Sequence, residues 1–363
     1  MARKRGRGRG EVRDAAKPFY LQIREQLLAD YEGKAGERLP SEKELCERYG
    51  VSRPTVRKAL ESLVEQGLVV RKPGKGSFVQ KRPKSKVKAQ EGVVVFVPGH
   101  WKIEEHNHFY LTQILAGILP VSHERKVDLN IVNFVAAECR AKLDRFHTHT
   151  AIWLSPYHGE YELMDELVGE GYCCAVINRR IPDARISYVM TSNTPASAEL
   201  TGLLLDAGHR RVALAGMVRN TDFFMERRRG FLKAHRARGV VHDPALVVGK
   251  SFSTPACRKE FEALLRGKDR PTAVFCTSGF YYEPVLQAIE RAGLKMPDDV
   301  SMTGFDEMPG ISVERGLTVA SQPLVELGRM CVEQVLAYRK SGKPFRTVLE
   351  PDLMKRTSVR AIG

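Results

Sequence analysis

Residues 39–63 read LPSEKELCERYGVSRPTVRKALESL, and their pattern predicts two short amphipathic helices separated by a turn at 49–50. Ser41 is a good N-cap for the first helix, and Glu44 stands three residues later to complete a capping box. Ser52 caps the second helix, which carries apolar residues on one side and arginine, lysine and hydroxyl side chains on the other. That composition is typical of a helix in the major groove of DNA, because arginine reads guanine edges with two hydrogen bonds.

Two surface helices with solvated basic faces would be the simpler interpretation, and the residues that follow argue against it. The segments 67–71 and 77–80 have the composition of short strands, and KPGKG at 72–76 supplies the turn between them. A basic hairpin directly after a basic helix predicts a winged-helix arrangement. The glycines do not predict a phosphate-binding loop, since such a loop leads from a strand into a helix.

Four short motifs carry a family resemblance. They are PFYLQI at 18–23, LPSE at 39–42, VSRPTVRKAL at 51–60 and GKGSFV at 74–79. Together they resemble the winged-helix DNA-binding domain of GntR-type transcriptional regulators. The resemblance implies DNA contact at Lys43, Arg53, Thr55 and Arg57, and it places the wing tip at 74–76. With their polar neighbours, the candidate DNA-binding residues are Ser41, Lys43, Ser52, Arg53, Thr55, Arg57, Lys58, Lys72, Gly74, Lys75 and Gly76.

Positive charge is concentrated in the amino-terminal quarter of the chain. The net charge of the 363 residues is +15, and residues 1–90 hold 23 Lys and Arg against 11 Asp and Glu, which is +12 of that total. Such an asymmetry predicts a phosphate-binding surface whose affinity falls steeply with salt. The sequence has neither an apolar run of the roughly 20 residues that cross a bilayer nor the apolar core of a secretion signal. We therefore expect a cytoplasmic protein without a membrane partner.

The cysteine and histidine spacing does not favour a metal site. The seven cysteines are odd in number and show no Cys-x-x-Cys spacing, which indicates reduced, packed thiols. A redox switch at the adjacent Cys173 and Cys174 is the alternative. The histidine pairs at 106/108 and 147/149 lack a third ligand at a convincing spacing. We expect neither a metal nor any other cofactor.

Composition sets the domain boundaries. Residues 1–16 are rich in arginine and glycine and predict a disordered basic tail, with a minor-groove arm as the alternative. Residues 17–80 are the winged-helix domain. The polar, basic segment KRPKSKVKAQ at 81–90 predicts a linker, and residues 91–363 form a second domain.

In this second domain, short apolar runs alternate with segments of helix length. The runs are 93–97, 128–134, 151–154, 174–177, 212–215, 273–276 and 300–303, and the helical segments include 111–125, 197–205 and 284–292. Apolar runs without alternation indicate parallel strands covered on both faces, so the pattern predicts a doubly wound parallel α/β fold. Ligands bind such sheets beyond the carboxyl ends of the strands.

Motifs in the second domain carry a second resemblance. They are Asn193, GHRRV at 208–212, Arg227, PTAVF at 271–275, the segment 293–306 and QPLVELG at 322–328. They resemble the effector-binding domain of LacI-type repressors, which is similar to periplasmic sugar-binding proteins. The resemblance implies two lobes around a cleft, lobe 1 at about 91–190 and 306–322 and lobe 2 at about 191–305 and 323–363. A GntR-type reader joined to a LacI-type sensor is the architecture of the arabinose repressor group.

The resemblance implies a ligand site built from the loops after the strands. The candidate effector-binding residues are Phe109, Tyr110, Ser155, Asn178, Arg179, Arg227, Ser278, Phe280 and Asp306. Arg227 suits ligand hydroxyls or a carboxylate through its planar fork, and a surface cation in the run 227–229 is the alternative. Where many LacI-type sensors have Asn-Asp, this chain has Ser-Gly at 278–279. Further aromatic residues could line the cleft: Trp101, His106, His108, Trp153 and Tyr157.

These patterns predict a sequence-specific DNA-binding transcriptional regulator, a repressor whose operator binding is controlled by a sugar or a related polar metabolite. We expect a homodimer, since two-fold protein symmetry is mirrored in a palindromic operator. An enzyme is not expected, because the sequence has no G-x-S-x-G, H-E-x-x-H or supported carboxylate pair. The alternative is a ligand-independent DNA-binding regulator with a degenerate sensor domain, which the missing carboxylate at Gly279 keeps open.

Overall fold

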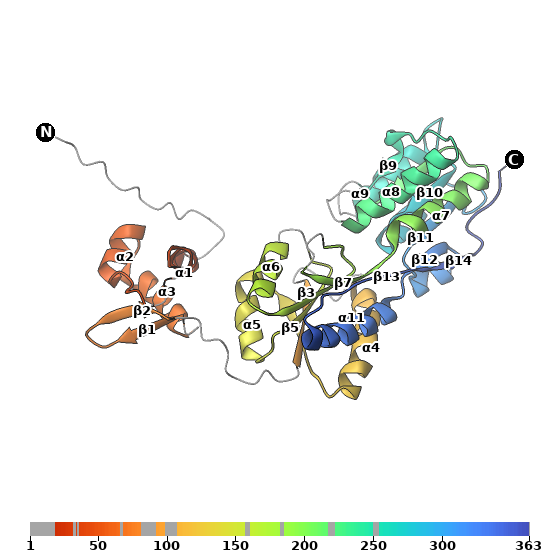
Figure 1. Ribbon diagram of the computed structural model, residues 1–363. Helices are drawn as coiled ribbons and strands as arrows, with labels where there is room; N and C mark the ends of the chain where they lie inside the picture. Colours follow the sequence, from red (N-terminus) through yellow and green to blue (C-terminus); the bar gives the residue numbers. More distant parts are fainter. Residues whose placement is uncertain are drawn as a thin grey trace. The chain divides into compact units, whose positions relative to one another are not determined.

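The computed structural model describes residues 19–31, 34, 36–65, 68–80, 92–98, 107–156, 160–181, 185–216, 222–249 and 254–362 (Figure 1). The chain falls into two compact units, Met1–Lys88 and Ala89–Gly363. Several features of the sequence analysis lie outside the described residues: the tail at 1–16, the linker at 81–90, Trp101, His106 and Tyr157.

The amino-terminal unit has three helices and a hairpin, as its sequence predicts. Its elements are α1 (Phe19–Asp30), α2 (Glu42–Tyr49), α3 (Arg53–Glu65), β1 (Val69–Lys72) and β2 (Gly76–Val79). Buried apolar side chains from the three helices and the first strand meet in one core. The capping box is confirmed, because Ser41 Oγ accepts from the Glu44 amide at 3.3 Å and the Glu44 carboxylate accepts from the Ser41 amide at 2.7 Å.

The hairpin gains a third extended segment that the sequence did not predict. β1 and β2 pair antiparallel along their whole length. On the other edge of β2, Arg38 forms an antiparallel bridge with Phe78, and the Leu39 amide donates to the Ser77 carbonyl at 2.8 Å. The segment before α2 therefore ties the wing to the helices.

The carboxy-terminal unit contains two six-stranded sheets. Its strands are β3 (Gly92–Pro98), β4 (Asp128–Phe134), β5 (Thr150–Leu154), β6 (Cys173–Ile177), β7 (Ser187–Thr191), β8 (Val212–Ala215), β9 (Val247–Val248), β10 (Ala273–Cys276), β11 (Ser301–Phe305), β12 (Thr318–Ser321), β13 (Arg346–Leu349) and β14 (Asp352–Met354). Sheet 1 has the order β13-β7-β6-β5-β3-β4 and is parallel, and sheet 2 has the order β14-β12-β11-β10-β8-β9 and is parallel except for β14. The predicted parallel α/β fold is confirmed.

Helices cover both faces of each sheet (Figure 1). Sheet 1 packs between α4 (Asn107–Glu124) with α11 (Leu324–Ser341) on one face and α5 (Cys139–Arg145) with α6 (Tyr161–Gly169) on the other. Sheet 2 packs between α7 (Asn193–Asp206) with α8 (Asp222–Ala237) and α9 (Thr254–Leu265) with α10 (Tyr282–Arg291). None of the described helices combines the length and the apolar character that a membrane span requires.

The carboxy-terminal segments do not divide between the lobes as predicted. β12 pairs with β11 in sheet 2, whereas α11 packs on α4 and β13 pairs with β7 in sheet 1. β14 then returns the chain to sheet 2. Lobe 1 therefore comprises about 92–190 and 324–349, and lobe 2 about 193–321 and 352–362. The prediction was wrong because the choice of sheet for each of these segments is decided by packing and strand pairing, which leave no local signal in the sequence.

The central strands, such as β3, β5 and β10, lack alternation because both of their faces are buried. In β3, Val93 and Val95 face the α4–α11 side, while Val94 and Phe96 face the α5–α6 side. Trp153 belongs to this second core and stacks on Phe96 with ring centroids 5.1 Å apart. Trp153 is therefore a core residue and does not line the cleft.

The helices α4 and α11 pack closely at Gly117 and Gly328. A substitution at this contact tests the packing of lobe 1. A Cβ atom on Gly328 would overlap the Ile114 carbonyl. We expect Gly328→Ala to lower the free energy of unfolding by about 1–3 kcal/mol, the usual cost of overpacking. Gly169→Ala at the end of α6, where a Cβ atom would meet nothing within 4 Å, is the control and should be neutral or stabilising. Equal urea denaturation midpoints for the two variants would contradict this packing.

Candidate functional site

The helix α3 presents its polar side to solvent. It buries its apolar residues in the core, whereas Arg53 and Arg57 are exposed. At its start, the hydroxyls of Ser52 and Thr55 share a hydrogen bond of 2.8 Å. The second predicted helix thus offers guanidinium groups and hydroxyls on one exposed surface.

Glu42 on α2 forms ion pairs with two arginines near this surface. It lies 3.6 Å from Arg57 Nη2 on α3 and 3.5 Å from Arg71 Nη2 on β1. Exposed pairs of this kind contribute no more than about 1 kcal/mol. A phosphate could therefore replace Glu42 as the partner of either arginine at small cost.

Three further predicted DNA-binding residues have partners within the unit. Lys58 Nζ lies 4.3 Å from the ring centroid of Tyr20, and Lys72 Nζ lies 5.1 Å from that of Phe78. The Ser41 hydroxyl belongs to the capping box. The remaining predicted residues of the first helix and the wing are exposed: Lys43, Gly74, Lys75 and Gly76.

The wing turn brings an additional arginine to this surface. Gly74 and Gly76 have φ angles of 71° and 103°, in the region that favours glycine. A Cβ atom on Gly76 would lie 2.9 Å from Arg38 Nε, so the Arg38 side chain lies directly against the turn. Sequence reasoning missed Arg38, because only the pairing of its segment with β2 places it there.

At the carboxyl edge of sheet 1, three predicted effector-binding residues meet. The Tyr110 hydroxyl lies 3.3 Å from Ser155 Oγ, after β5, and also within hydrogen-bonding reach of the Asn178 side chain, after β6. Ser155 and Asn178 are buried and have left-handed φ angles of 45° and 62°. Non-glycine residues in this region are strained and cluster at functional sites. Burial raises the pKa of Tyr110, so its phenol keeps its proton and can donate to a ligand.

At the carboxyl edge of sheet 2, Asp306 gathers the predicted residues of lobe 2. Its Oδ2 atom accepts from Ser278 Oγ at 2.8 Å and from the Gly279 amide at 3.2 Å. The same oxygen lies 3.7 Å from Arg227 Nη1. Asp306 also has a left-handed φ, 85°. The structure therefore brings Arg227, Ser278 and Asp306 together, with much of the carboxylate already bound by protein donors.

Gln322 joins the two groups, and sequence reasoning did not assign it to the site. Its Oε1 atom accepts from Asn178 Nδ2 and from Thr191 Oγ1, both at 2.9 Å. Its Nε2 atom donates to Asp306 Oδ1 at 2.6 Å. Gln322 lies where the chain passes from β12 to α11, so one amide connects loops of both lobes at their junction. Its place in the motif at 322–328 was the available signal.

Arg227 is buried, so the alternative of a surface cation is wrong. The residue is 1% exposed, and its guanidinium carbon lies 3.6 Å from the ring centroid of Phe305. Nε donates to Asn193 Oδ1 at 2.9 Å, and Nη1 donates to the Thr277 carbonyl at 2.7 Å. Burial lowers the pKa of Arg227, and the Asp306 carboxylate opposes that shift. Arg227 positions the loops of lobe 2 as well as facing the site.

Side chains of the two lobes also touch beside this cluster. Arg180 Nε, in the loop after β6, lies 3.2 Å from Glu226 Oε1 on α8. Arg179 is buried, and its guanidinium carbon lies 4.4 Å from the ring centroid of Phe223 on α8. The lobes are therefore linked by charge and by stacking as well as by the chain crossings.

Two predicted effector-binding residues contribute mainly to the cores. Phe109 packs against the α4–α11 side of sheet 1, and Phe280 packs against the α9–α10 side of sheet 2. Both are half-buried. Their prediction rested on position after a strand, which does not fix the direction of a side chain.

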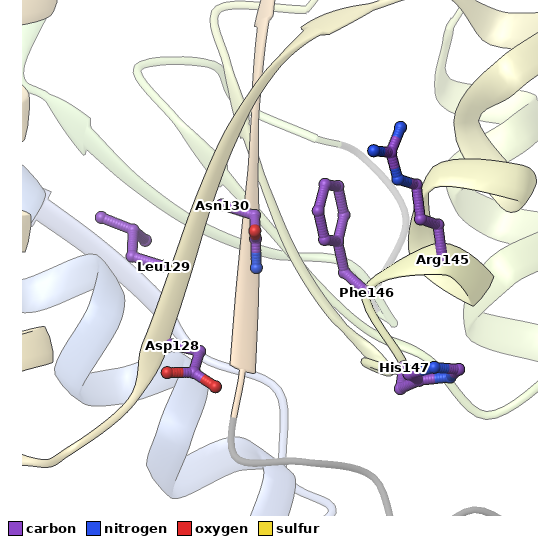
Figure 2. Close-up of a pocket in the computed structure, with 6 residues that line it drawn as sticks. All are labelled: Asp128, Leu129, Asn130, Arg145, Phe146 and His147. Carbon is purple, nitrogen blue, oxygen red and sulfur yellow. The ribbon is translucent and has the colours of Figure 1, made fainter.

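A shallow pocket of about 320 Å³ lies elsewhere on lobe 1 (Figure 2). It is lined by Asp128, Leu129, Asn130, Arg145, Phe146 and His147. The first three are the amino-terminal residues of β4, whereas Ser155 and Asn178 follow the carboxyl ends of β5 and β6. Since β3, β4, β5 and β6 are parallel, this pocket lies at the opposite edge of sheet 1 from the polar cluster.

Most of the thiols are buried in this fold. Cys139 and Cys174 are buried, and burial raises the pKa of Cys139 to about 12. Within the described ranges, no group of three or more His, Cys, Asp or Glu side chains could hold a metal ion.

The Asp306 network yields a test by isosteric substitution. Asp306→Asn would turn an amide donor toward Ser278 and Gly279 or toward Gln322, each of which already donates to the carboxylate. We expect a loss of about 1–3 kcal/mol in the free energy of unfolding, measured by urea denaturation. Asp298→Asn, in an exposed pair with Arg360, is the control and should change stability by less than about 0.5 kcal/mol. Equal effects of the two changes would show that the Asp306 contacts are not formed.

Two family descriptions match the chain. Residues 19–79 match "Bacterial regulatory proteins, gntR family", and residues 201–359 match "Periplasmic binding protein-like domain". Both describe regulatory or binding domains, in agreement with the prediction that the protein is not an enzyme.

Individual proteins resemble the chain over different lengths. The arabinose metabolism transcriptional repressor of Geobacillus stearothermophilus is 26% identical over 97% of this chain and 100% of its own. The ribose operon repressor of Haemophilus influenzae is 31% identical over 45% of this chain and 50% of its own. The structure of a LacI family transcriptional regulator from Enterococcus faecium with bound ribose superimposes with a TM-score of 0.65, at 19% identity, over 75% of this chain and 100% of its own. The chain is a transcriptional regulator in which a gntR-family DNA-binding domain precedes a periplasmic binding protein-like domain.

Proposed function

We propose that the protein is a repressor that releases its operator when a sugar or related polar metabolite binds between the lobes of the second domain. The observation that carries this proposal is the polar cluster at the lobe junction, where the carboxyl edges of both sheets meet around Gln322. Open parallel sheets place ligands at this edge. The exposed basic helix and wing of the first domain supply the DNA-binding surface that such a repressor also needs.

We assign DNA recognition to α3 and phosphate contact to the wing. Arg53 and Arg57 are exposed on α3, so each can reach a guanine edge with two hydrogen bonds. Lys75 and Arg38 lie at the wing turn, where short backbone segments can approach phosphates. Lys58 and Lys72 lie over aromatic rings and can add charge without reading bases.

The effector class follows from the polar groups of the cluster. Tyr110 and Ser155 offer hydroxyls, Asn178 an amide and Arg227 a guanidinium, which together suit a polyhydroxylated ligand. The ribose bound to the Enterococcus faecium regulator is a ligand of this chemistry. The arabinose metabolism repressor, similar along nearly the whole chain, points in the same direction.

We further propose that the protein acts in the cytoplasm as a homodimer that holds two winged helices on one palindromic operator. Ligand can shift the relation of the lobes only through unequal affinity for their arrangements. The chain crossings between the lobes and the contacts of Arg179 and Arg180 with α8 are the elements through which such a shift would act. The expected sign is relief of repression.

One observation favours a second function, regulation that is independent of a ligand. Gly279 carries no carboxylate, and Asp306 beside it already accepts from three protein donors. A regulator that binds DNA without a small-molecule effector would have this feature. A thermal-shift screen of sugars, sugar acids and nucleosides separates the two, because ligand at 100 times its dissociation constant stabilises the native state by about 2.7 kcal/mol.

The recognition helix is tested by single arginine changes. We expect Arg53→Ala and Arg57→Ala each to weaken binding to an operator selected from a random DNA library by about 1–3 kcal/mol. Arg329→Ala on α11, which removes the same charge from an exposed pair in the other unit, is the control. Fluorescence anisotropy at several salt concentrations measures the effect. Operator affinity equal to that of the control in both variants would exclude α3 as the reader.

The effector site is tested by a change that keeps the charge of Arg227. Arg227→Lys loses the planar fork that contacts Asn193 and Thr277 but retains a cation beside Asp306. We expect operator affinity without ligand to stay unchanged, while the ligand concentration that releases DNA rises about tenfold or more, a loss of at least about 1.4 kcal/mol. An unchanged response to the ligand found in the thermal-shift screen would place the pocket elsewhere.

A further inference from the structure

Beside the polar cluster, on the lobe 2 side of the candidate effector site, stands a methionine next to a glycine. Gly279 follows β10 and lies at the carboxyl edge of sheet 2, next to Asp306. A Cβ atom on Gly279 would lie 2.5 Å from Met308 Cγ and 3.1 Å from Met308 Sδ. The Met308 side chain therefore fills the space into which a side chain at 279 would extend.

The position of Met308 is fixed by its own loop. The Met308 amide donates to Ser312 Oγ at 2.9 Å, and the Ser312 amide donates back to the Met308 carbonyl at 2.6 Å. Ser312 is fully buried. The preceding residue, Glu307, pairs with Arg356 at 2.9 Å. Met308 is thus a built part of the wall, held from both sides of the loop.

The polar groups next to Met308 already have partners. Ser278 Oγ donates to Asp306, and Asp306 Oδ2 also accepts from the Gly279 amide. Asp306 Oδ1 accepts from Gln322. The Met308 thioether is only a weak acceptor. A ligand hydroxyl turned toward this wall would lose its water without gaining an equivalent partner.

The lobe 1 side of the cluster is polar. Tyr110, Ser155 and Asn178 present two hydroxyls and an amide at the carboxyl edge of sheet 1. A ligand that satisfies both walls is therefore hydroxylated on one edge and apolar on the other.

On the basis of the proposed function, we propose that Met308 and Gly279 select a deoxy sugar, a polyhydroxylated effector that carries hydrogen in place of one hydroxyl of its fully hydroxylated counterpart. The hydroxyls of the ligand face lobe 1, and the deoxygenated carbon packs on the Met308 side chain. Met308 is then a specificity-determining residue that disfavours the fully hydroxylated sugar.

Matched sugar pairs test this proposal on the full-length protein. Isothermal titration calorimetry compares L-rhamnose with L-mannose, L-fucose with L-galactose, and 2-deoxy-D-ribose with D-ribose. We expect the deoxy member of at least one pair to bind about tenfold or more tightly than its counterpart, within the range by which an apolar pocket discriminates against one hydroxyl. The same member should release operator DNA at the lower concentration.

Two isosteric variants locate the selectivity. Met308→Gln places an amide in the wall and should bring the paired affinities to within about twofold, because the hydroxyl then has a partner. Met308→Leu keeps the wall apolar and should retain the preference for the deoxy sugar. Operator binding without sugar shows that each variant is folded.

Three results would overturn the inference. One is a hydroxylated sugar that binds as tightly as its deoxy partner and releases DNA, which leaves the proposed function standing. Another is a deoxy preference that persists in Met308→Gln. The third is the absence of binding by every deoxy sugar at millimolar concentrations. In that case the proposed function is tested separately, by whether another metabolite from the thermal-shift screen releases operator DNA.

Discussion

The amide of Gln322 is the contact on which the arrangement of the second domain depends. The lobes have separate sheets and separate cores, and the chain passes between them near 192, 322 and 350. At the second of these passages, Gln322 accepts from Asn178 of lobe 1 and donates to Asp306 of lobe 2. Both partners hold left-handed backbone angles, which only a well-packed surrounding can maintain. One side chain thus joins the polar groups of loops from two sheets.

Burial makes this cluster rigid as well as polar. Arg227 is almost fully removed from water, and it donates to Asn193 and to a backbone carbonyl. A buried cation without such partners would cost several kcal/mol, so these contacts fix the geometry of the loops around it. The same network ties down Asp306, and Met308 adds an apolar side chain on the lobe 2 side. On the lobe 1 side, Tyr110, Ser155 and Asn178 supply two hydroxyls and an amide. The two walls of the site therefore differ in chemistry.

In the amino-terminal unit, the basic side chains are oriented by exposed ion pairs and cation–π contacts. Its basic side chains are partly arranged by weak partners, Glu42 for Arg57 and Arg71, and aromatic rings for the lysines. Such exposed contacts are worth little individually, so they orient the charges without competing strongly with phosphate. The bridge between Arg38 and Phe78 adds a third extended segment that fixes the wing to the helices. Recognition helix and wing are consequently presented by one compact core.

The sequence by itself determined the winged helix, the two-domain organisation and the parallel α/β class, because capping residues, glycine turns and apolar runs are local signals. It also identified most of the polar cluster, since Ser155, Asn178 and Asp306 each follow a recognisable strand. It did not determine which lobe receives β12, α11 and β13, nor that Arg227 is buried, nor that Gln322 joins the loops and Arg38 reaches the wing. Those outcomes were decided only by the tertiary structure, because they depend on packing and hydrogen bonds between residues far apart in the chain.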